Sequence, residues 1–207
     1  MPLETIENSP DIVWGLWKIT EDEQTLTAEV APFETIPENI TNKSKRLEFI
    51  GARVLVKHLL EYRDVKFRGL TKDEFGKPFL KGLDFQISLS HSYPYVAAVI
   101  HQQHAVGIDV EQPKEKLLKI APRILHPAEQ LDAGKNVVKH CIYWCAKESL
   151  IKIHGKKDLV FAENLRIDPF IQGTHGELIG RIIVDNKETA VLLQYFVYEF
   201  FVLVVNK

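Results

Sequence analysis

The strongest constraint on the fold is that each half of the chain contains one long helical pattern beside short strand patterns. Apolar residues recur three and four positions apart over residues 41–62, and a second such pattern covers residues 137–154. Strand-like runs accompany them at residues 12–19, 85–90, 95–100, 106–110, 181–184 and 189–205. Gly76 and Pro78 predict a turn at residues 73–78, and the Ser-His-Ser-Tyr-Pro segment at residues 90–94 is expected to be a loop. The sequence therefore predicts an α+β chain of two pseudo-symmetric lobes, each a helix packed on a small antiparallel sheet.

The length agrees with this division. A chain of 207 residues can form two domains of about one hundred residues each. We place the boundary between residues 1–104, the N-terminal lobe, and residues 105–207, the C-terminal lobe. With 45% hydrophobic and 26% charged residues, the composition is that of a globular protein and excludes a disordered or collagen-like chain.

Charge is distributed unevenly although the formal net charge is only −2. Residues 1–40 contain one lysine and nine acids, whereas residues 41–82 contain eleven Lys and Arg against five acids, a balance of +6. This basic stretch is either a solvated helix face or a pocket for a polyanionic ligand. The near-neutral total argues against a general nucleic-acid coat protein, so we expect no nucleic acid as a partner.

Three features of the sequence bear on the cellular compartment of the protein. The apolar run over residues 190–205 is interrupted by Gln194 and Glu199, so it predicts paired strands and no membrane span. The first residues lack the charged and apolar regions of a signal peptide. Cys141 and Cys145 are four apart in a helical segment and are expected to be buried, free thiols. We therefore expect a cytoplasmic protein.

Asp109 and Glu111 are two residues apart at the end of a predicted strand. Alternation along a strand directs both carboxylates to one face and Val110 to the other. Mg²⁺ commonly binds one or two carboxylates and completes its shell with water and substrate phosphate. A solvated surface strand with two acids is the alternative interpretation.

Glu148 and Lys152 lie on one face of the second helix together with Trp144, because the three are four residues apart, and Lys147 lies at the edge of that face. The pattern permits a simple ladder of helical ion pairs. It equally permits a third metal ligand flanked by ammonium groups that neutralise phosphate charge.

Taken together, four motifs resemble the 4′-phosphopantetheinyl transferase superfamily, specifically the surfactin-synthetase type. They are Gly76-Lys77-Pro78, Ser88-Leu89-Ser90-His91, Gly107-Ile108-Asp109-Val110-Glu111 and Trp144-x-x-Lys147-Glu148-Ser149-x-x-Lys152. The resemblance implies a single chain with two lobes and an active site at the lobe interface. It also implies transfer of the phosphopantetheine arm of coenzyme A to a serine of an apo acyl or peptidyl carrier protein, with release of adenosine 3′,5′-bisphosphate.

The resemblance assigns roles to individual residues. Mg²⁺, with Mn²⁺ as the alternative metal, would be bound by Asp109, Glu111 and Glu148. The catalytic residues would be Glu148, Lys147 and Lys152, with Glu148 deprotonating the serine directly or through a metal-bound water. Coenzyme A would contact Arg46, Arg53, Lys77, Pro78, Ser90, His91, Asp109, Lys147 and Lys152.

The segment after the two acids is the expected docking region for the carrier, since Lys114, Lys116 and Lys119 suit an acidic partner helix. The family further implies a monomer, because the two lobes supply one interface internally. Two alternatives stay open: a coenzyme A pyrophosphohydrolase that uses the same acids, and a catalytically inactive coenzyme A or carrier-binding module.

Overall fold

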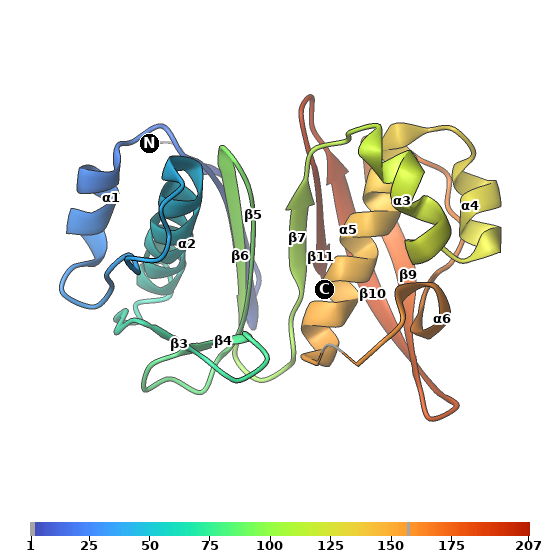
Figure 1. Cartoon of the computed structure of the whole chain (residues 1–207). Helices are drawn as coiled ribbons and strands as arrows, with labels where there is room; N and C mark the ends of the chain where they lie inside the picture. The colour runs from blue at the N-terminus through green and yellow to red at the C-terminus, as the bar shows by residue number, and fades with distance from the viewer. Residues whose placement is uncertain (1–2, 157) are drawn as a thin grey trace. The chain divides into compact units, whose positions relative to one another are not determined.

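The computed structural model describes residues 3–156 and 158–207, which form helices and antiparallel sheets (Figure 1). The chain divides into two compact units, Met1–Val106 and Gly107–Lys207. The division lies within two residues of the boundary expected from the sequence. We call them unit 1 and unit 2 and describe each separately.

Unit 1 is built on a four-stranded antiparallel sheet with the order β1-β2-β6-β5. Its strands are β1 (Leu3–Asn8), β2 (Ile12–Lys18), β5 (Gln86–Ser92) and β6 (Tyr95–His101). Strands β2, β5 and β6 are those predicted. A short hairpin of β3 (Leu70–Lys72) and β4 (Pro78–Leu80) encloses the turn predicted at residues 73–78.

The basic helix of unit 1 is α2 (Lys43–Glu61), preceded by α1 (Glu23–Val30). Asn42 begins α2 by accepting a hydrogen bond from the backbone N–H of Lys45 at 3.1 Å, as a helix cap does. The apolar face of α2 packs on the sheet in a core that includes Ile50, Leu55 and Leu59, each fully buried. Two charged residues of α2, Glu48 and Arg53, are buried as well.

Unit 2 contains a five-stranded antiparallel sheet with the order β7-β11-β10-β9-β8. Its strands are β7 (Ile108–Glu111), β8 (Leu165–Ile167), β9 (His175–Val184), β10 (Lys187–Val197) and β11 (Val202–Asn206). The apolar run near the C-terminus thus forms the paired strands β10 and β11, as predicted.

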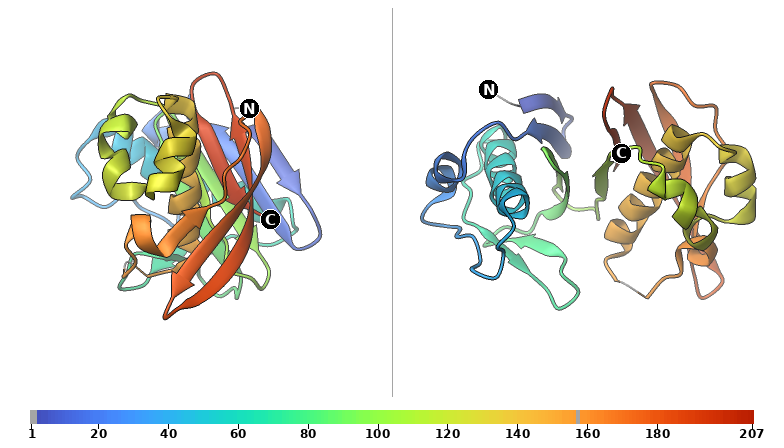
Figure 2. Two further views of the ribbon diagram at one scale, coloured as in Figure 1. Left: turned by 90° about the vertical axis from the view of Figure 1, so that its right-hand side faces the viewer. Right: turned by 45° about the horizontal axis from the view of Figure 1, so that its top comes forward.

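Helix α5 (Val137–His154) lies against one face of this sheet, with α3 (Lys116–Ile124), α4 (Pro127–Ala133) and α6 (Phe161–Asn164) around it (Figure 2). Asn136 caps the start of α5, and Gly155, with φ of 81°, ends it in the left-handed region. Both cysteines are buried and free, as predicted. Among the described helices, none has the length and apolar character needed to cross a membrane.

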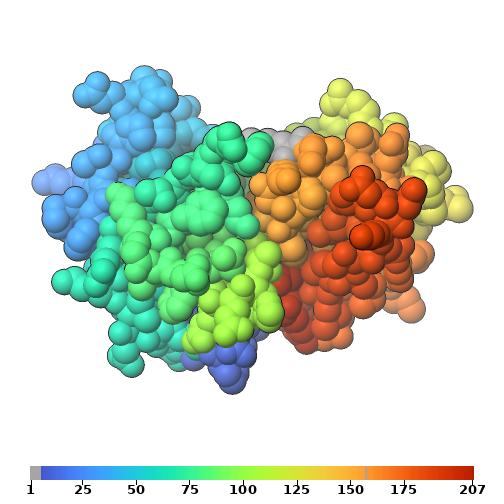
Figure 3. Space-filling view, turned by 90° about the horizontal axis from the view of Figure 1, so that it is seen from below, coloured from blue at the N-terminus to red at the C-terminus, as the bar shows by residue number. Residues whose placement is uncertain are grey.

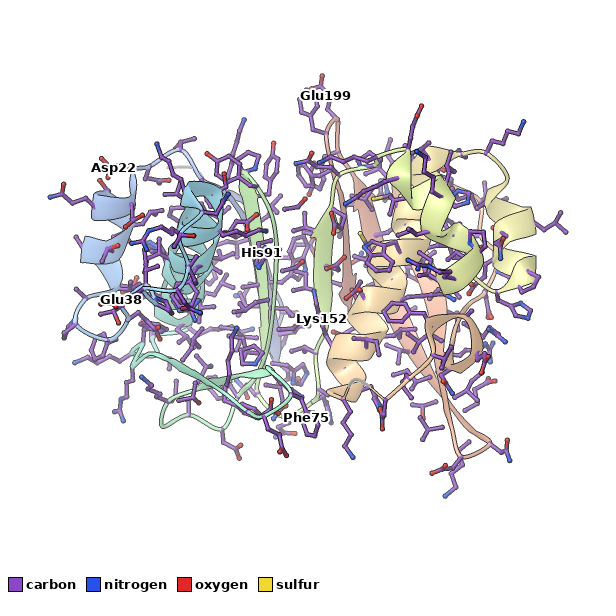
Figure 4. All side chains as sticks on the ribbon, viewed as in Figure 1. Asp22, Glu38, Phe75, His91, Lys152 and Glu199 are labelled. Carbon is purple, nitrogen blue, oxygen red and sulfur yellow. The ribbon has the colours of Figure 1, made fainter. Side chains whose placement is uncertain are left out.

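One prediction about local structure was wrong. The Ser-His-Ser-Tyr-Pro segment was expected to be a loop, but β5 continues through His91 to Ser92 and pairs with β6 in the registers His91↔Val96 and Ser92↔Tyr95. Pairing with an apolar neighbouring strand outweighed the local turn propensity of serine and proline. His91 is therefore held on a strand (Figure 4).

Candidate active site

Unit 1 contains a cavity of about 560 Å³ beside the first turns of α2. The hairpin β3–β4 borders the cavity, and the surface of this hairpin is drawn in teal to green in Figure 3. Its lining comes from the segment before α2, from α2, from the hairpin and from β5: Asn39, Ile40, Thr41, Asn42, Lys45, Glu48, Phe49, Ala52, Arg53, Lys72, Gly76, Pro78, Leu89 and His91. The lining contains Lys45, Arg53 and Lys72, so the cavity suits an anionic ligand.

Arg53 lines this cavity and is only 6% exposed, and its side chain is held by several contacts. Its Nε donates to Oε2 of Glu34 at 2.8 Å, and Nη1 donates to the carbonyl oxygen of Phe49 at 2.8 Å. The guanidinium also lies 3.3 Å from the centroid of the Phe49 ring. Because Glu34 and Phe49 fix the side chain, the arginine is already ordered before a ligand binds.

Glu48 is a buried carboxylate in the lining that belongs to none of the four sequence motifs. It accepts hydrogen bonds from Nζ of Lys45 at 2.6 Å and from the backbone N–H of Tyr93 at 2.9 Å. Nδ1 of His91 lies 3.2 Å from its Oε2. Burial raises the pKa of Glu48, but the hydrogen bonds from His91 and Lys45 outweigh it and bring the pKa down to about 2.

The residues of unit 1 predicted to bind coenzyme A fall into two groups. Arg53, Pro78 and His91 line the cavity. The remaining three do not belong to its lining: Arg46, Lys77 and Ser90.

Each of these three residues has a defined place in unit 1 outside the lining. Arg46 forms a bidentate ion pair with Glu23, with Nη2 to Oε1 at 2.6 Å and Nε to Oε2 at 2.7 Å. Ser90 is buried within β5. Lys77 lies in the hairpin turn, where its backbone N–H donates to Oδ1 of Asp73 at 2.8 Å. The turn thus brings Pro78, and not the side chain of Lys77, to the cavity.

In unit 2, β7 and α5 bring the predicted acids near a lysine. Asp109 is 5% exposed and Val110 is fully buried, while Glu111 at the end of β7 is only partly buried. Nζ of Lys152 donates to Oδ1 of Asp109 at 2.8 Å and to the carbonyl oxygen of Ile108 at 2.7 Å. Lys152 on α5, labelled in Figure 4, thereby joins the last turn of the helix to the strand.

Glu148 lies one turn before Lys152 on the same helix. Burial, followed by the negative charge of Asp109, raises the pKa of Glu148 to about 7; Glu111 acts in the same direction, and Lys152 opposes it. The three carboxylates are thus close enough for their charges to interact.

The donor set fits a hard divalent cation, since carboxylate oxygens are its preferred ligands and a cation would offset the negative charges that raise the pKa of Glu148. Within residues 3–156 and 158–207, however, no three His, Cys, Asp or Glu side chains already meet the geometry of a metal site. The predicted set of Asp109, Glu111 and Glu148 is therefore near one another but is not assembled as a closed site.

Lys147 differs from its prediction. Its side chain is completely buried, with Nζ 2.6 Å from Oε2 of Glu129, 2.9 Å from the carbonyl oxygen of Ile124 and 3.0 Å from that of Phe161. Burial lowers the pKa of Lys147, and the charge of Glu129 opposes this. A helical step of about 100° separates Lys147 from Glu148, so the two side chains leave α5 in different directions. The structure directs this ammonium to Glu129 and to two backbone carbonyl oxygens in the core of unit 2.

Glu129 completes this buried arrangement. It accepts hydrogen bonds from the backbone N–H groups of His126 at 2.7 Å and Ile167 at 2.8 Å. Because Lys147 and Glu129 together contact α3, α4, α6 and β8, they fix these elements around α5. Trp144 is a packing residue on the same helix, stacked on Phe161 with ring centroids 5.6 Å apart.

The three lysines assigned to carrier docking are exposed at the start of α3: Lys114, Lys116 and Lys119. The apolar side of α3 carries Leu117 and Ala121, which are buried. The basic side of the helix is therefore available to a partner.

Comparison with known proteins gives matches of one kind. Residues 105–196 match the sequence profile of the family described as the 4′-phosphopantetheinyl transferase superfamily. The chain is 32% identical over 114 residues to the 4′-phosphopantetheinyl transferase gsp of Aneurinibacillus migulanus, covering 52% of this chain and 47% of that protein. It is 34% identical over 103 residues to the 4′-phosphopantetheinyl transferase Sfp of Bacillus subtilis, covering 47% of this chain and 44% of that protein.

A Haemophilus influenzae protein with the provisional name 4′-phosphopantetheinyl transferase is 28% identical over 154 residues, which is 64% of each chain. The chain thus spans between 44% and 64% of the length of these three relatives. The matching segment contains Asp109, Glu111, Glu148 and Lys152.

Proposed function

We propose that this chain, whose residues 105–196 carry a domain of the 4′-phosphopantetheinyl transferase superfamily, is itself a 4′-phosphopantetheinyl transferase. It transfers the phosphopantetheine arm of coenzyme A to a serine of an apo acyl or peptidyl carrier protein and releases adenosine 3′,5′-bisphosphate. The observation that carries the proposal is the contact of Lys152 with Asp109, one helical turn from Glu148, inside the matching segment.

The cavity of unit 1 suits the nucleotide end of coenzyme A. That end carries about four negative charges near neutral pH, counting up to two for the phosphate monoester. Lys45, Arg53, Lys72 and His91 line the cavity, and Arg53 is ordered beforehand by Glu34 and Phe49. An ordered cation loses little conformational entropy on binding, which favours affinity. Arg46, Lys77 and Ser90 belong to the proposal only as neighbours of this cavity.

Asp109, Glu111 and Glu148 would hold Mg²⁺, or Mn²⁺ in its place. The bound cation would supply charge neutralisation at the pyrophosphate that is cleaved. Asp109 provides an oxygen whose orientation Lys152 fixes, and Glu111 lies on the same strand at its exposed end. The assignment is supported by the charges of Asp109 and Glu111, because both raise the pKa of Glu148.

Glu148 accepts the proton of the carrier serine as its hydroxyl oxygen attacks phosphorus. The bond between this phosphorus and the bridging oxygen of the coenzyme A pyrophosphate breaks, and adenosine 3′,5′-bisphosphate leaves with that oxygen. Lys152 uses two acceptors, Asp109 and the Ile108 carbonyl oxygen, so one of the three donors of its ammonium group is available to a phosphate oxygen. Lys147 acts by holding α5 in place through Glu129.

The carrier would approach the exposed lysines of α3, whose positive charge suits an acidic partner helix. In line with the resemblance, we propose a monomer that works in the cytoplasm.

The decisive experiment is incubation of the chain with coenzyme A, Mg²⁺ and an apo acyl carrier protein, followed by intact-mass measurement. We expect the carrier to gain one phosphopantetheine, and a Ser→Ala carrier to gain none. Adenosine bisphosphate formed in the absence of carrier would instead identify a coenzyme A pyrophosphohydrolase. A chain that binds coenzyme A but forms neither product would be an inactive binding module.

A further inference from the structure

Glu48 presents a physical problem in unit 1, because a buried carboxylate lies in the wall of a cavity that is otherwise basic. It is 2% exposed and lines the same cavity as Arg53 and Lys72. An isolated carboxylate at this place would repel an anionic ligand and would be costly to bury. Its burial therefore needs compensating contacts.

Glu48 has such contacts on both of its oxygens. One oxygen accepts from the backbone N–H of Tyr93, and the other meets both Nζ of Lys45 and Nδ1 of His91. With its pKa near 2, the carboxylate is ionised at neutral pH and can only accept hydrogen bonds. Nδ1 of His91 must then carry the hydrogen of this contact.

The backbone contact makes the arrangement more specific than an ordinary surface ion pair. Tyr93 follows directly after β5, the strand that holds His91, so Glu48 binds both the ring and the turn beside it. The ring of His91 is 46% exposed and borders the cavity, which leaves its opposite edge, with Nε2, open to a ligand.

We propose that Glu48 is a positioning residue for His91: it fixes the doubly protonated ring through Nδ1–H, so that Nε2–H donates to an anionic oxygen of the ligand in the unit 1 cavity. This assignment rests on the proposed transferase function for the identity of that ligand, the bisphosphorylated nucleotide end of coenzyme A. The pairing also cancels the charge of Glu48, so the carboxylate orients a donor without making the cavity repulsive.

The test compares Glu48→Gln with Glu61→Gln. Both glutamates lie on α2, but Glu61 is exposed, and its Oε1 lies 3.6 Å from Nζ of Lys57, away from the lining of this cavity. The probe is adenosine 3′,5′-bisphosphate, with binding measured by titration calorimetry and the His91 nitrogens followed by ¹⁵N NMR. Steady-state transfer with a carrier separates KM from kcat.

We expect Glu48→Gln to weaken binding of the bisphosphate and to raise the coenzyme A KM by about tenfold, as loss of a charge-assisted hydrogen bond does. The kcat should change by less than about twofold, because Glu48 acts only through binding. In a His91→Ala background the same substitution should add less than about twofold. Glu61→Gln should leave all of these values unchanged.

Three outcomes would contradict the assignment. Wild-type His91 with no hydrogen on Nδ1 would overturn it without any variant, even if Glu48→Gln failed to fold. If the wild type binds the bisphosphate and Glu48→Gln binds it with unchanged affinity, the role of Glu48 is overturned while the proposed function stands. A wild-type chain that binds no bisphosphate would overturn the proposed function together with this assignment.

Discussion

Nζ of Lys152 lies 2.8 Å from Oδ1 of Asp109, so one ion pair joins the last turn of α5 to strand β7. Of the two side chains, Asp109 is 7% exposed and Lys152 23% exposed. The pair lies beside Glu148, whose pKa responds to both charges. The ion pair explains how a helix and a strand about forty residues apart in sequence bring their charged side chains together.

Replacing Glu148 by Gln should reduce transfer on the order of 10²- to 10⁴-fold, because the group that accepts the serine proton is lost. Binding of coenzyme A, measured by calorimetry, should persist, since the cavity in unit 1 is untouched. The matched control is Glu177→Gln, an exposed glutamate of β9 paired with Lys207. Full activity in Glu148→Gln would refute the assignment of this residue.

Replacing Asp109 by Asn should raise the Mg²⁺ concentration needed for half-maximal transfer by on the order of tenfold or more, because a charged ligand becomes neutral. The measurement is the rate of transfer as a function of Mg²⁺ at saturating coenzyme A and carrier. An unchanged Mg²⁺ dependence would remove Asp109 from the metal site.

Breaking the buried pair in unit 2 should destabilise the fold. Lys147→Met leaves the carboxylate of Glu129 buried without its cation, and loss of one partner of such a pair costs about 3–5 kcal/mol. Chemical denaturation would measure the change in the free energy of unfolding. Lys187→Met, at an exposed position in β10, is the control. If Lys147 instead bound phosphate, the variant would keep its stability and lose affinity for coenzyme A.

Stability should fall in acid partly because of Glu48. Its folded-state pKa of about 2 is below the ordinary value of 4.5, so its contribution is complete above pH 4.5 and is lost as the pH falls toward 2. The contribution amounts to at most about 3 kcal/mol. Between pH 5 and pH 2 the free energy of unfolding should fall less steeply with decreasing pH in Glu48→Gln than in the wild type. The same pH dependence in both proteins would contradict this account.

Reversing the charge of the docking lysines, with Lys114→Glu and Lys116→Glu together, should raise the KM for the carrier several-fold while the KM for coenzyme A stays constant. The physical reason is that rim charges govern encounter with an oppositely charged partner. Lys187→Glu, also exposed in unit 2, should have no effect on either constant. A carrier KM unaffected by the double reversal would place docking elsewhere.

Much of the fold was predictable from sequence because it follows from local periodicity. The helices α2 and α5 carry long apolar patterns that are visible in the residues alone. The strand at β1, by contrast, carries too weak an alternation and exists because it pairs with β2. The short elements β3, β4 and α4 were also not predicted, since their residues are fixed by tertiary contacts.

The sequence by itself determined which chemical groups the chain contains, because the Asp-x-Glu spacing on a strand and the spacing of Glu148 and Lys152 on a helix set their faces through backbone geometry. Only the tertiary structure decided which charged side chains are paired with an opposite charge and which lie beside charges of the same sign. Lys147 and Glu148 are neighbours in sequence, yet one is buried against Glu129 while the other lies among acids. In the sequence, Glu48 is an acid among the basic residues of a helix, and only the fold places its partner His91 of β5 beside it. Such partners come from distant segments, and burial in a low-dielectric interior makes the choice of partner decisive for each charge.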